Sequence, residues 1–406
     1  MTQTHAAGEG PRDRLGVWSG GVLVAGAALA PVLVWLGPMG FAALVALMGL
    51  LSLPAARIDD ADRPAALLLF AGLIWAAVST TWSPYHPKHA ASSTILKLAL
   101  QLPLYWCALC GARRATTAAQ TLALRCLAWG LGAVGLVMIA EAATAGSIYK
   151  WLHLRFYEPI RPDLAEANLG HSTFVMGLLW PLAAAGAPAR WRGWLTGVIV
   201  AGTLVAALCF SSDAPVVSMV LAPAVGWAVW RWPSRAPKVF AGVAALFFLI
   251  APLLVGAARA SGDYSAIERA IPLSWSMRMG YWGHAIDWIG ERPLRGWGLD
   301  ASRMFGPGIV LHPHDAALQV WLELGLVGAV TAAAFWGLTL IRLSRPTPSL
   351  AAAAGAAATA VYLLFGGLNF GVWQEWWLGL GALVAIFTAT LESQALAPSL
   401  RAGPST

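Results

Sequence analysis

Stretches of about twenty apolar residues recur from one end of this 406-residue chain to the other. A helix needs about 20 consecutive apolar residues to cross the hydrocarbon core of a bilayer. Apolar residues make up 58% of the chain and charged residues 11%, whereas soluble domains average about 45–50% and about 25%. The composition therefore excludes a water-soluble globule and predicts an all-α, polytopic membrane protein.

The apolar stretches predict about twelve spans. They lie near residues 17–36, 38–56, 64–82, 92–112, 119–145, 168–188, 191–211, 214–232, 237–257, 317–341, 349–367 and 374–392. This pattern divides the chain into three parts. We expect an N-terminal bundle of about nine spans over 1–257, a large loop over 258–316, and a C-terminal bundle of about three spans over 317–406.

The basic residues predict the orientation in the membrane. The net charge is +7, but Lys and Arg stand in short clusters between alternate spans, from Arg12 and Arg14 to Arg342 and Arg345. Cytoplasmic loops retain such residues near span ends. The charge is thus a topology signal rather than a sign of a nucleic-acid partner. We expect both termini in the cytoplasm and the loop 258–316 on the opposite face.

The loop 258–316 is far longer than the other connections, and loops of that length are usually functional or disordered. Its tryptophan and tyrosine residues argue against disorder, because they can bury apolar surface. An apolar stripe at helical spacing predicts a helix along the membrane interface from about Ser274 to Gly290. The stripe consists of Tyr281, Trp282, Ala285, Ile286, Trp288 and Ile289. Proline and glycine residues mark the ends of this helix, with Pro272 before it and Pro293, Gly296 and Gly298 after it.

The same loop contains six arginines and no lysine. A guanidinium binds phosphate oxygens bidentately and stays charged near a low-dielectric surface, which suits a pyrophosphate at a membrane. The alternative is an ordinary solvated network with the acidic residues of the loop. Arg278 and Arg303 are the candidates for function, because each lies where the loop should return to the membrane.

The segment Leu311–Leu318 opens the tenth predicted span. Asp315 is a good N-cap residue, which puts His314 just before the first turn. The positive end of the helix dipole favours a neutral imidazole that can act as a general base, while Asp315 has the opposite effect on the His314 pKa. The alternative is that His314 only binds loop backbone. A zinc site would need more ligands than His312 and His314, and none is close in sequence.

Glu323 stands inside the tenth span, where an ionisable residue suggests a function by default. It lies nine residues after His314, roughly 13 Å along one helix, which is too far for direct contact. We expect Glu323 to orient or pair groups within the bundle. Gly325 and Gly328 should let another helix approach closely.

Residues 274–328 resemble the signature region of the O-antigen ligase and polymerase superfamily. The matching features are Ser276-Met277-Arg278, Trp282, Glu291-Arg292-Pro293-Leu294-Arg295-Gly296-Trp297-Gly298, Arg303, His312-Pro313-His314-Asp315-Ala316-Ala317-Leu318-Gln319 and Glu323-Leu324-Gly325. A long loop before the tenth of about twelve spans also agrees with that family. The order of these motifs, their spacing and their expected position in the membrane thus all agree with the pattern of that superfamily.

The resemblance implies a metal-independent, inverting glycosyltransferase without a cofactor, acting on the periplasmic face of a bacterial inner membrane. The donor would be a glycan on undecaprenyl pyrophosphate, and the acceptor in the ligase branch a sugar of the lipid A core. His314 would take the proton from the acceptor hydroxyl. Arg278 and Arg303 would bind the pyrophosphate, and His312 would position the acceptor.

Two positions depart from the family pattern. Asp213 stands where the family often has a phosphate-binding arginine, so that role does not transfer, and an acceptor-binding role remains open. Asp315 stands where asparagine is common, which adds a charge beside His314. We expect an O-antigen ligase. The alternatives are a polymerase of the same superfamily, which shares the donor and the site, and a transporter, for which the expected symmetry of broken helices is missing.

Overall fold

The computed structural model describes residues 11–401, and over that range it contains fifteen α-helices and no strand. The all-α class is confirmed. The helices are α1 (Pro11–Leu36), α2 (Phe41–Leu51), α3 (Arg63–Ser79), α4 (Thr94–Arg114), α5 (Thr117–Ala143), α6 (Ser147–Phe156), α7 (Pro162–Gly186), α8 (Arg192–Cys209), α9 (Asp213–Arg231), α10 (Ala236–Ala260), α11 (Tyr264–Ala270), α12 (Leu273–Glu291), α13 (Ala316–Ile341), α14 (Leu350–Leu368) and α15 (Glu375–Arg401).

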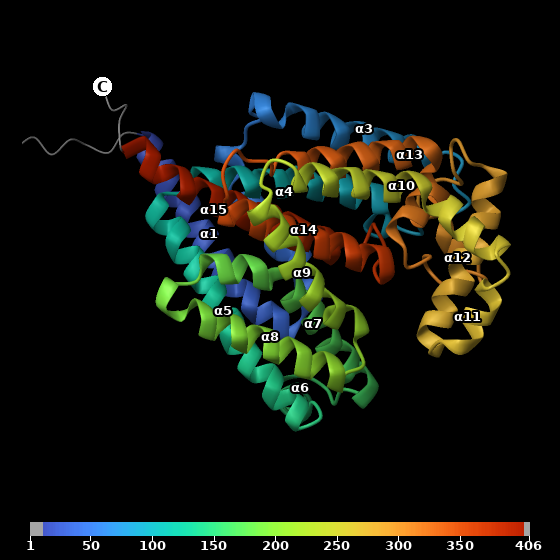
Figure 1. The fold of residues 1–406 in the computed structure, drawn as a ribbon, viewed down its shortest axis with the longest axis horizontal. Helices are drawn as coiled ribbons and strands as arrows, with labels where there is room; N and C mark the ends of the chain where they lie inside the picture. The colour runs from blue at the N-terminus through green and yellow to red at the C-terminus, as the bar shows by residue number, and fades with distance from the viewer. Residues whose placement is uncertain (1–10, 402–406) are drawn as a thin grey trace, which may run out of the picture. The chain divides into compact units, whose positions relative to one another are not determined.

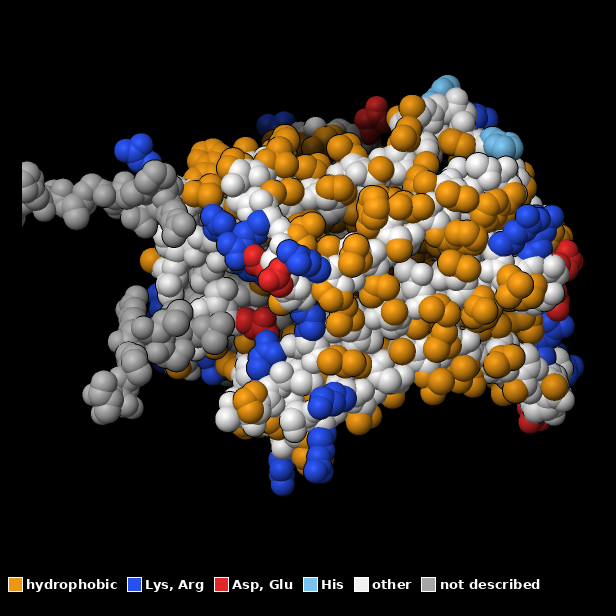
Figure 2. Space-filling view, turned by 90° about the horizontal axis from the view of Figure 1, so that it is seen from above, with side chains coloured by type: hydrophobic (Ala, Val, Ile, Leu, Met, Phe, Trp, Pro, Cys, Tyr) orange, Lys and Arg blue, Asp and Glu red, His pale blue; other side chains and the backbone are white. Residues whose placement is uncertain are grey.

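Ten of the described helices are long and apolar enough to cross a membrane, namely α1, α3, α4, α5, α8, α9, α10, α13, α14 and α15. Two of the predicted spans are therefore not among the candidates. The stretch 38–56 forms only the short helix α2 after a 3-10 turn at Pro38–Gly40, and α7 carries Asp163, Glu166 and His171 in its first half. Hydrophobic side chains cover most of the face in Figure 2, while charged side chains gather towards its two ends.

The described residues fall into two compact units, each built from separate pieces of the chain. Within the described range, the first comprises the residues up to Arg57, Pro103–Met219 and the residues from Gly379 on, and the second comprises Ile58–Leu102 and Val220–Leu378. The division at 257 and 316 that the sequence predicts separates the large loop from the predicted membrane spans rather than one compact unit from another. It stays a prediction. All of the candidate site residues except Asp213 belong to the second unit.

In the first unit, α1, α5, α7 and α8 pack against one another. The backbones of α5 and α8 meet at Gly135 and Gly202, where a Cβ on either glycine would collide with the other helix. Fully buried Glu141 on α5 accepts a 2.9 Å hydrogen bond from Nε1 of Trp35. A buried carboxylate of this kind needs such a donor to offset its lost hydration.

In the second unit, α3, α10 and α13 run side by side, with α12 across one end (Figure 1). The predicted interfacial helix is confirmed as a helix, because α12 begins and ends within one residue of the expected bounds. Its predicted stripe faces the core of the unit. Tyr281, Ala285 and Ile289 are buried against residues of α10 and α13, and the other three stripe residues pack beside them.

A break in α13 positions the loop that follows α12. Gly325 has φ 65° and ψ −160°, a conformation that is essentially restricted to glycine. The helix bonds across the break are replaced by bonds to the loop: Leu326 N donates to Pro293 O at 2.8 Å, Trp297 N to Leu322 O at 2.8 Å and Gly298 N to Glu323 O at 2.7 Å. The expectation that another helix approaches Gly325 is therefore wrong, since the backbone of segment 293–298 takes that place.

We predict that Gly325→Ala destabilises the protein by roughly 2 kcal/mol or more, because alanine is strained at this φ and ψ and its Cβ would collide with Leu294 O. Thermal unfolding in detergent measures the effect. The control is Gly21→Ala on α1, where nothing lies within 4 Å of the new Cβ. Equal melting temperatures for the two variants would contradict the strain argument.

Candidate functional site

The segment from 300 to 314 is held in an unusual backbone conformation. Three of the described non-glycine residues with positive φ lie in it, Asp300 at 61°, Leu311 at 66° and His314 at 55°. Such conformations persist only where the surroundings enforce them, and they cluster at functional sites. One enforcing contact comes from α12, where Trp282 Nε1 donates a 3.0 Å hydrogen bond to Pro313 O.

His314 contacts the protein backbone through one of its two ring nitrogens. Its Nδ1 lies 2.6 Å from the backbone carbonyl oxygen of Asn369, between α14 and α15. Because a carbonyl oxygen only accepts, the proton of the neutral ring must be on Nδ1, and Nε2 carries the lone pair. The ring also stacks on Tyr281, with centroids 5.9 Å apart. This arrangement makes Nε2 the nitrogen that can act as a base.

His312 supports the backbone of His314. Its Nδ1 accepts a 3.2 Å hydrogen bond from His314 N, and its Nε2 lies 3.4 Å from Nε2 of Gln374. The two imidazole centroids are 4.2 Å apart. The His312 ring also lies directly on Gly371, where a Cβ would approach within 2.8 Å of the ring. His312 is thus held from both sides.

Both histidines favour the neutral form. Burial lowers the pKa of His314 below its ordinary 6.5, the Asn369 carbonyl raises it in part, and the positive charge of Arg278 lowers it further. Burial, with the charges of His314 and Arg303, lowers the pKa of His312 to about 3. The sequence leaves the net shift of the His314 pKa open, because the helix dipole and Asp315 act in opposite directions. In the structure, burial is the main cause of the lowered pKa.

The N-cap role of Asp315 is confirmed, because its Oδ1 accepts a 2.9 Å hydrogen bond from Leu318 N. Burial raises the pKa of this carboxyl to about 7, against the opposing effect of the backbone hydrogen bonds. Asp315 is not among the causes that shift the His314 pKa. The carboxyl group therefore serves the start of α13 rather than the imidazole.

The two candidate arginines both lie within electrostatic reach of the histidine pair. Nε of Arg303 donates to Oδ1 of buried Asp300 at 2.9 Å, and its guanidinium lies 5.3 Å from the centre of the Tyr85 ring. Arg278 lies over Trp275 at 4.9 Å. The alternative of ordinary ion pairs applies best to Arg259, which pairs with Asp287 at 2.8 Å.

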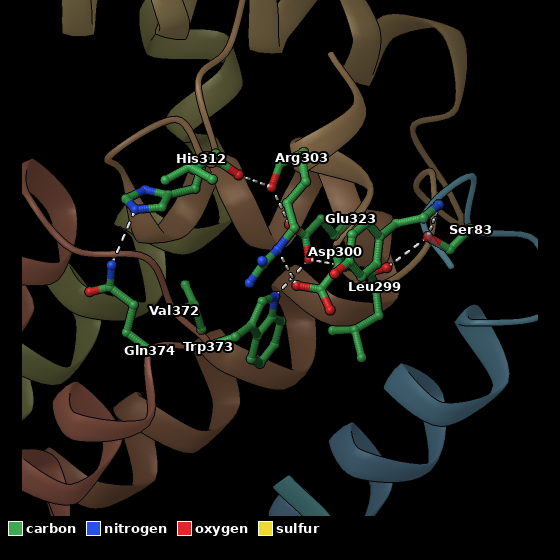
Figure 3. Close-up of polar contacts among 12 residues, drawn as sticks. Ser83, Leu299, Asp300, Arg303, His312, Glu323, Val372, Trp373 and Gln374 are labelled. Atoms are coloured by element: carbon green, nitrogen blue, oxygen red, sulfur yellow. Dashed lines mark hydrogen bonds and ion pairs between the residues drawn. The ribbon is translucent and has the colours of Figure 1, made fainter. Parts of the chain in front are cut away.

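Glu323 is fully buried, and its carboxylate accepts four hydrogen bonds. Figure 3 shows Glu323 beside Asp300 and Trp373. Oε2 accepts from Asp300 N at 2.8 Å and from Trp373 Nε1 at 2.6 Å. Oε1 accepts from Ser302 Oγ at 2.6 Å and from Gln319 Nε2 at 3.1 Å. The donors come from the loop before α13, from α13 itself and from the loop after α14.

Sequence reasoning missed the loop of residues 369–374, which contacts both histidines and Glu323. Besides the contacts above, Val372 N donates to Gln319 Oε1 at 2.9 Å. The only sequence signal is a short polar interruption, Asn369-Phe370-Gly371-Val372-Trp373-Gln374, between the last two predicted spans. Asp213 begins α9 in the first unit. No group of three or more potential metal ligands occurs among the described residues.

A family profile described as O-antigen ligase matches residues 197–333. The resemblance to the O-antigen ligase family is thereby confirmed over this segment. The segment contains the arginines, the histidine pair and Glu323, and it ends before the loop of residues 369–374.

Relatives provisionally named polysaccharide ligases each match about a third of the chain. One from Rickettsia conorii is 27% identical over 143 residues, which cover 32% of this chain and 35% of that protein. One from Rickettsia felis is 24% identical over 143 residues, with the same coverage of both chains. The chain thus matches about a third of the length of these relatives.

We predict that His314 stays neutral below pH 6.5, because its pKa lies below that ordinary value. Diethyl pyrocarbonate reacts with the neutral imidazole, so the modification rate of His314, followed by mass spectrometry, should fall by half only at a pH below 6.5. N-acetylhistidine serves as the reference. A midpoint at or above that of the reference would show that burial and Arg278 do not lower the pKa.

Proposed function

We propose that this protein is an O-antigen ligase that transfers a glycan from undecaprenyl pyrophosphate to a sugar hydroxyl of the lipid A core. The reaction is metal-independent and inverts the configuration at the anomeric carbon. It takes place on the periplasmic face of the bacterial inner membrane, with both termini of the protein in the cytoplasm. The match of residues 197–333 to the O-antigen ligase profile supports the class of reaction.

The observation that carries the proposal is the orientation of His314. Its Nδ1 is bonded to the Asn369 carbonyl oxygen at 2.6 Å, so Nε2 is the acceptor for a substrate proton. The lowered pKa keeps this nitrogen unprotonated at physiological pH. A general base must be both positioned and in its basic form, and His314 meets both conditions.

In the proposed reaction, His314 Nε2 takes the proton from the acceptor hydroxyl as that oxygen bonds to the anomeric carbon of the donor. The bond between this carbon and the pyrophosphate oxygen breaks, and undecaprenyl pyrophosphate leaves with the bonding electrons. Arg278 and Arg303 offset the negative charge that develops on the leaving group. Asp300 holds Nε of Arg303, which leaves the two terminal amino groups of that guanidinium for phosphate oxygens.

We expect the parent protein to restore long-chain lipopolysaccharide in a bacterial host that lacks its own ligase, and His314→Ala to abolish it. The reason is that alanine removes the proton acceptor. Gel analysis of lipopolysaccharide measures the outcome, in a host that supplies a compatible glycan and core. Immunoblotting confirms equal expression of both proteins.

The possible outcomes separate the claims. Restoration by both proteins would disprove the role of His314 and retain the ligase. Restoration by neither, in a host whose core a control ligase accepts, would favour the polymerase branch, which glycan chain length then tests. In either branch the donor and the arginines are the same.

We expect Arg278→Lys and Arg303→Lys each to lower transfer at least roughly 10-fold, because lysine keeps the charge but loses the bidentate fork. Initial rates with a lipid-linked glycan donor measure this. Arg269→Lys is the matched control, since Nε of Arg269 bonds only a neighbouring backbone oxygen, Ser265 O, at 3.0 Å. Unchanged function in both variants, together with substrate flux in vesicles, would favour the transporter alternative.

A further inference from the structure

Glu323 lies between the two halves of the candidate site. On one side, Asp300 N donates to Glu323 Oε2 at 2.8 Å, and Oδ1 of the same aspartate holds Arg303 Nε at 2.9 Å. Ser302, which precedes Arg303, lies 2.6 Å from Glu323 Oε1 and 2.9 Å from Leu311 O. These contacts connect the carboxylate to the arginine.

On the other side, Trp373 Nε1 donates to Glu323 Oε2 at 2.6 Å. Trp373 belongs to the loop of residues 369–374, and this loop bears the Asn369 carbonyl oxygen on His314 Nδ1 and the Gln374 amide beside His312. Gln319 strengthens the connection, because its Nε2 donates to Glu323 and its Oε1 accepts from Val372 N. The carboxylate is thus also connected to the histidines.

We propose that Glu323 is a positioning residue that sets the general base His314 and the pyrophosphate-binding Arg303 in one fixed arrangement. Its two arms are Trp373, which leads to the base, and Ser302 with Asp300, which leads to the arginine. The inference rests on the proposed function and adds to it a part of the site, the loop of residues 369–374, that lies beyond the family match. Glu323 touches no reacting atom in this assignment.

Physical chemistry favours a carboxylate over other side chains at this point. Two oxygens with two lone pairs each accept four bonds, and the four donors around Glu323 use this capacity fully. Hydrogen bonds to a charged acceptor contribute about 1.5–3 kcal/mol each. A glutamine of the same size would turn one acceptor oxygen into an NH₂ donor and leave two of the four donors without a partner.

The test compares Glu323→Gln with variants that remove one arm each. We expect Trp373→Phe to lower kcat roughly 10-fold, with the donor KM within about 2-fold of the parent value. We expect Ser302→Ala to raise the donor KM roughly 5-fold, with kcat at saturating donor nearly unchanged. Glu323→Gln should combine both effects. The assay uses the full-length protein in detergent with a lipid-linked glycan donor and a lipid A-core acceptor.

A second readout does not depend on turnover. The groups that face His314 are His312, Arg278, the Asn369 carbonyl and the Tyr281 ring. Loosening the loop of residues 369–374 exposes the imidazole, so in Trp373→Phe and Glu323→Gln the pH midpoint of diethyl pyrocarbonate modification at His314 should rise towards that of free histidine. In Ser302→Ala it should not move.

Glu141→Gln is the matched control, because Glu141 is also a fully buried carboxylate that accepts an indole N–H, from Trp35, but belongs to the first unit. It should lower thermal stability and leave the donor KM, kcat and the His314 midpoint unchanged. The inference is overturned if Glu323→Gln behaves like this control, or if both single-arm variants give the same pattern. If the parent protein transfers no glycan, the proposed function fails, while the modification midpoints still decide whether the loop holds the base.

Discussion

The candidate site depends on the backbone hydrogen bonds that join segment 293–298 to the break in α13. A membrane-spanning helix must satisfy its backbone groups internally or through buried protein partners, because the bilayer core supplies no water. Gly325 interrupts the helix, and the loop supplies the missing partners through Pro293 O, Trp297 N and Gly298 N. The side chain of Trp75 on α3 adds a 2.9 Å bond to Leu324 O. The break is therefore satisfied, and the loop is held against α13.

The contact between segment 293–298 and α13 explains why residues of the loop before α13 can reach the buried carboxylate of Glu323. In an unbroken helix, a buried carboxylate would meet only side chains of neighbouring helices. Here the chain leaves Gly298 beside the Glu323 carbonyl and turns at once through Asp300, whose positive φ directs its N–H to the carboxylate. The same turn starts the 3-10 helix Ala301–Met304, which carries Arg303. One backbone contact thus determines where the arginine lies.

The parts of this arrangement that the sequence could predict are those with a side-chain pattern. The stripe on α12 has the period of a helix, and Asp315 has the chemistry of an N-cap, so the sequence predicts both. In the loop of residues 369–374, a backbone carbonyl oxygen contacts His314, and the missing side chain of Gly371 makes room for the His312 ring. Neither feature leaves a chemical signature in the sequence. A glycine with positive φ and a glycine under a closely packed helix look the same in one sequence, so the sequence predicts only close packing at Gly325. The sequence predicts about twelve spans, whereas ten described helices are long and apolar enough to cross a membrane. The difference arises because α2 is too short and because α7 carries polar residues in its first half.

Electrostatics connects the two tasks of the site. The two arginines proposed to hold the pyrophosphate also lower the pKa of a nearby imidazole, Arg278 that of His314 and Arg303 that of His312. A lower pKa makes the imidazole a weaker base but keeps it unprotonated, and the optimum lies where both factors balance. A pyrophosphate neutralised by guanidinium groups is a good leaving group, so the attack needs little activation of the hydroxyl. In the proposed reaction, the arginines thus lower the base strength that the attack requires and also lower the base strength of the imidazoles. One cluster of charges would then serve both the leaving group and the acceptor hydroxyl.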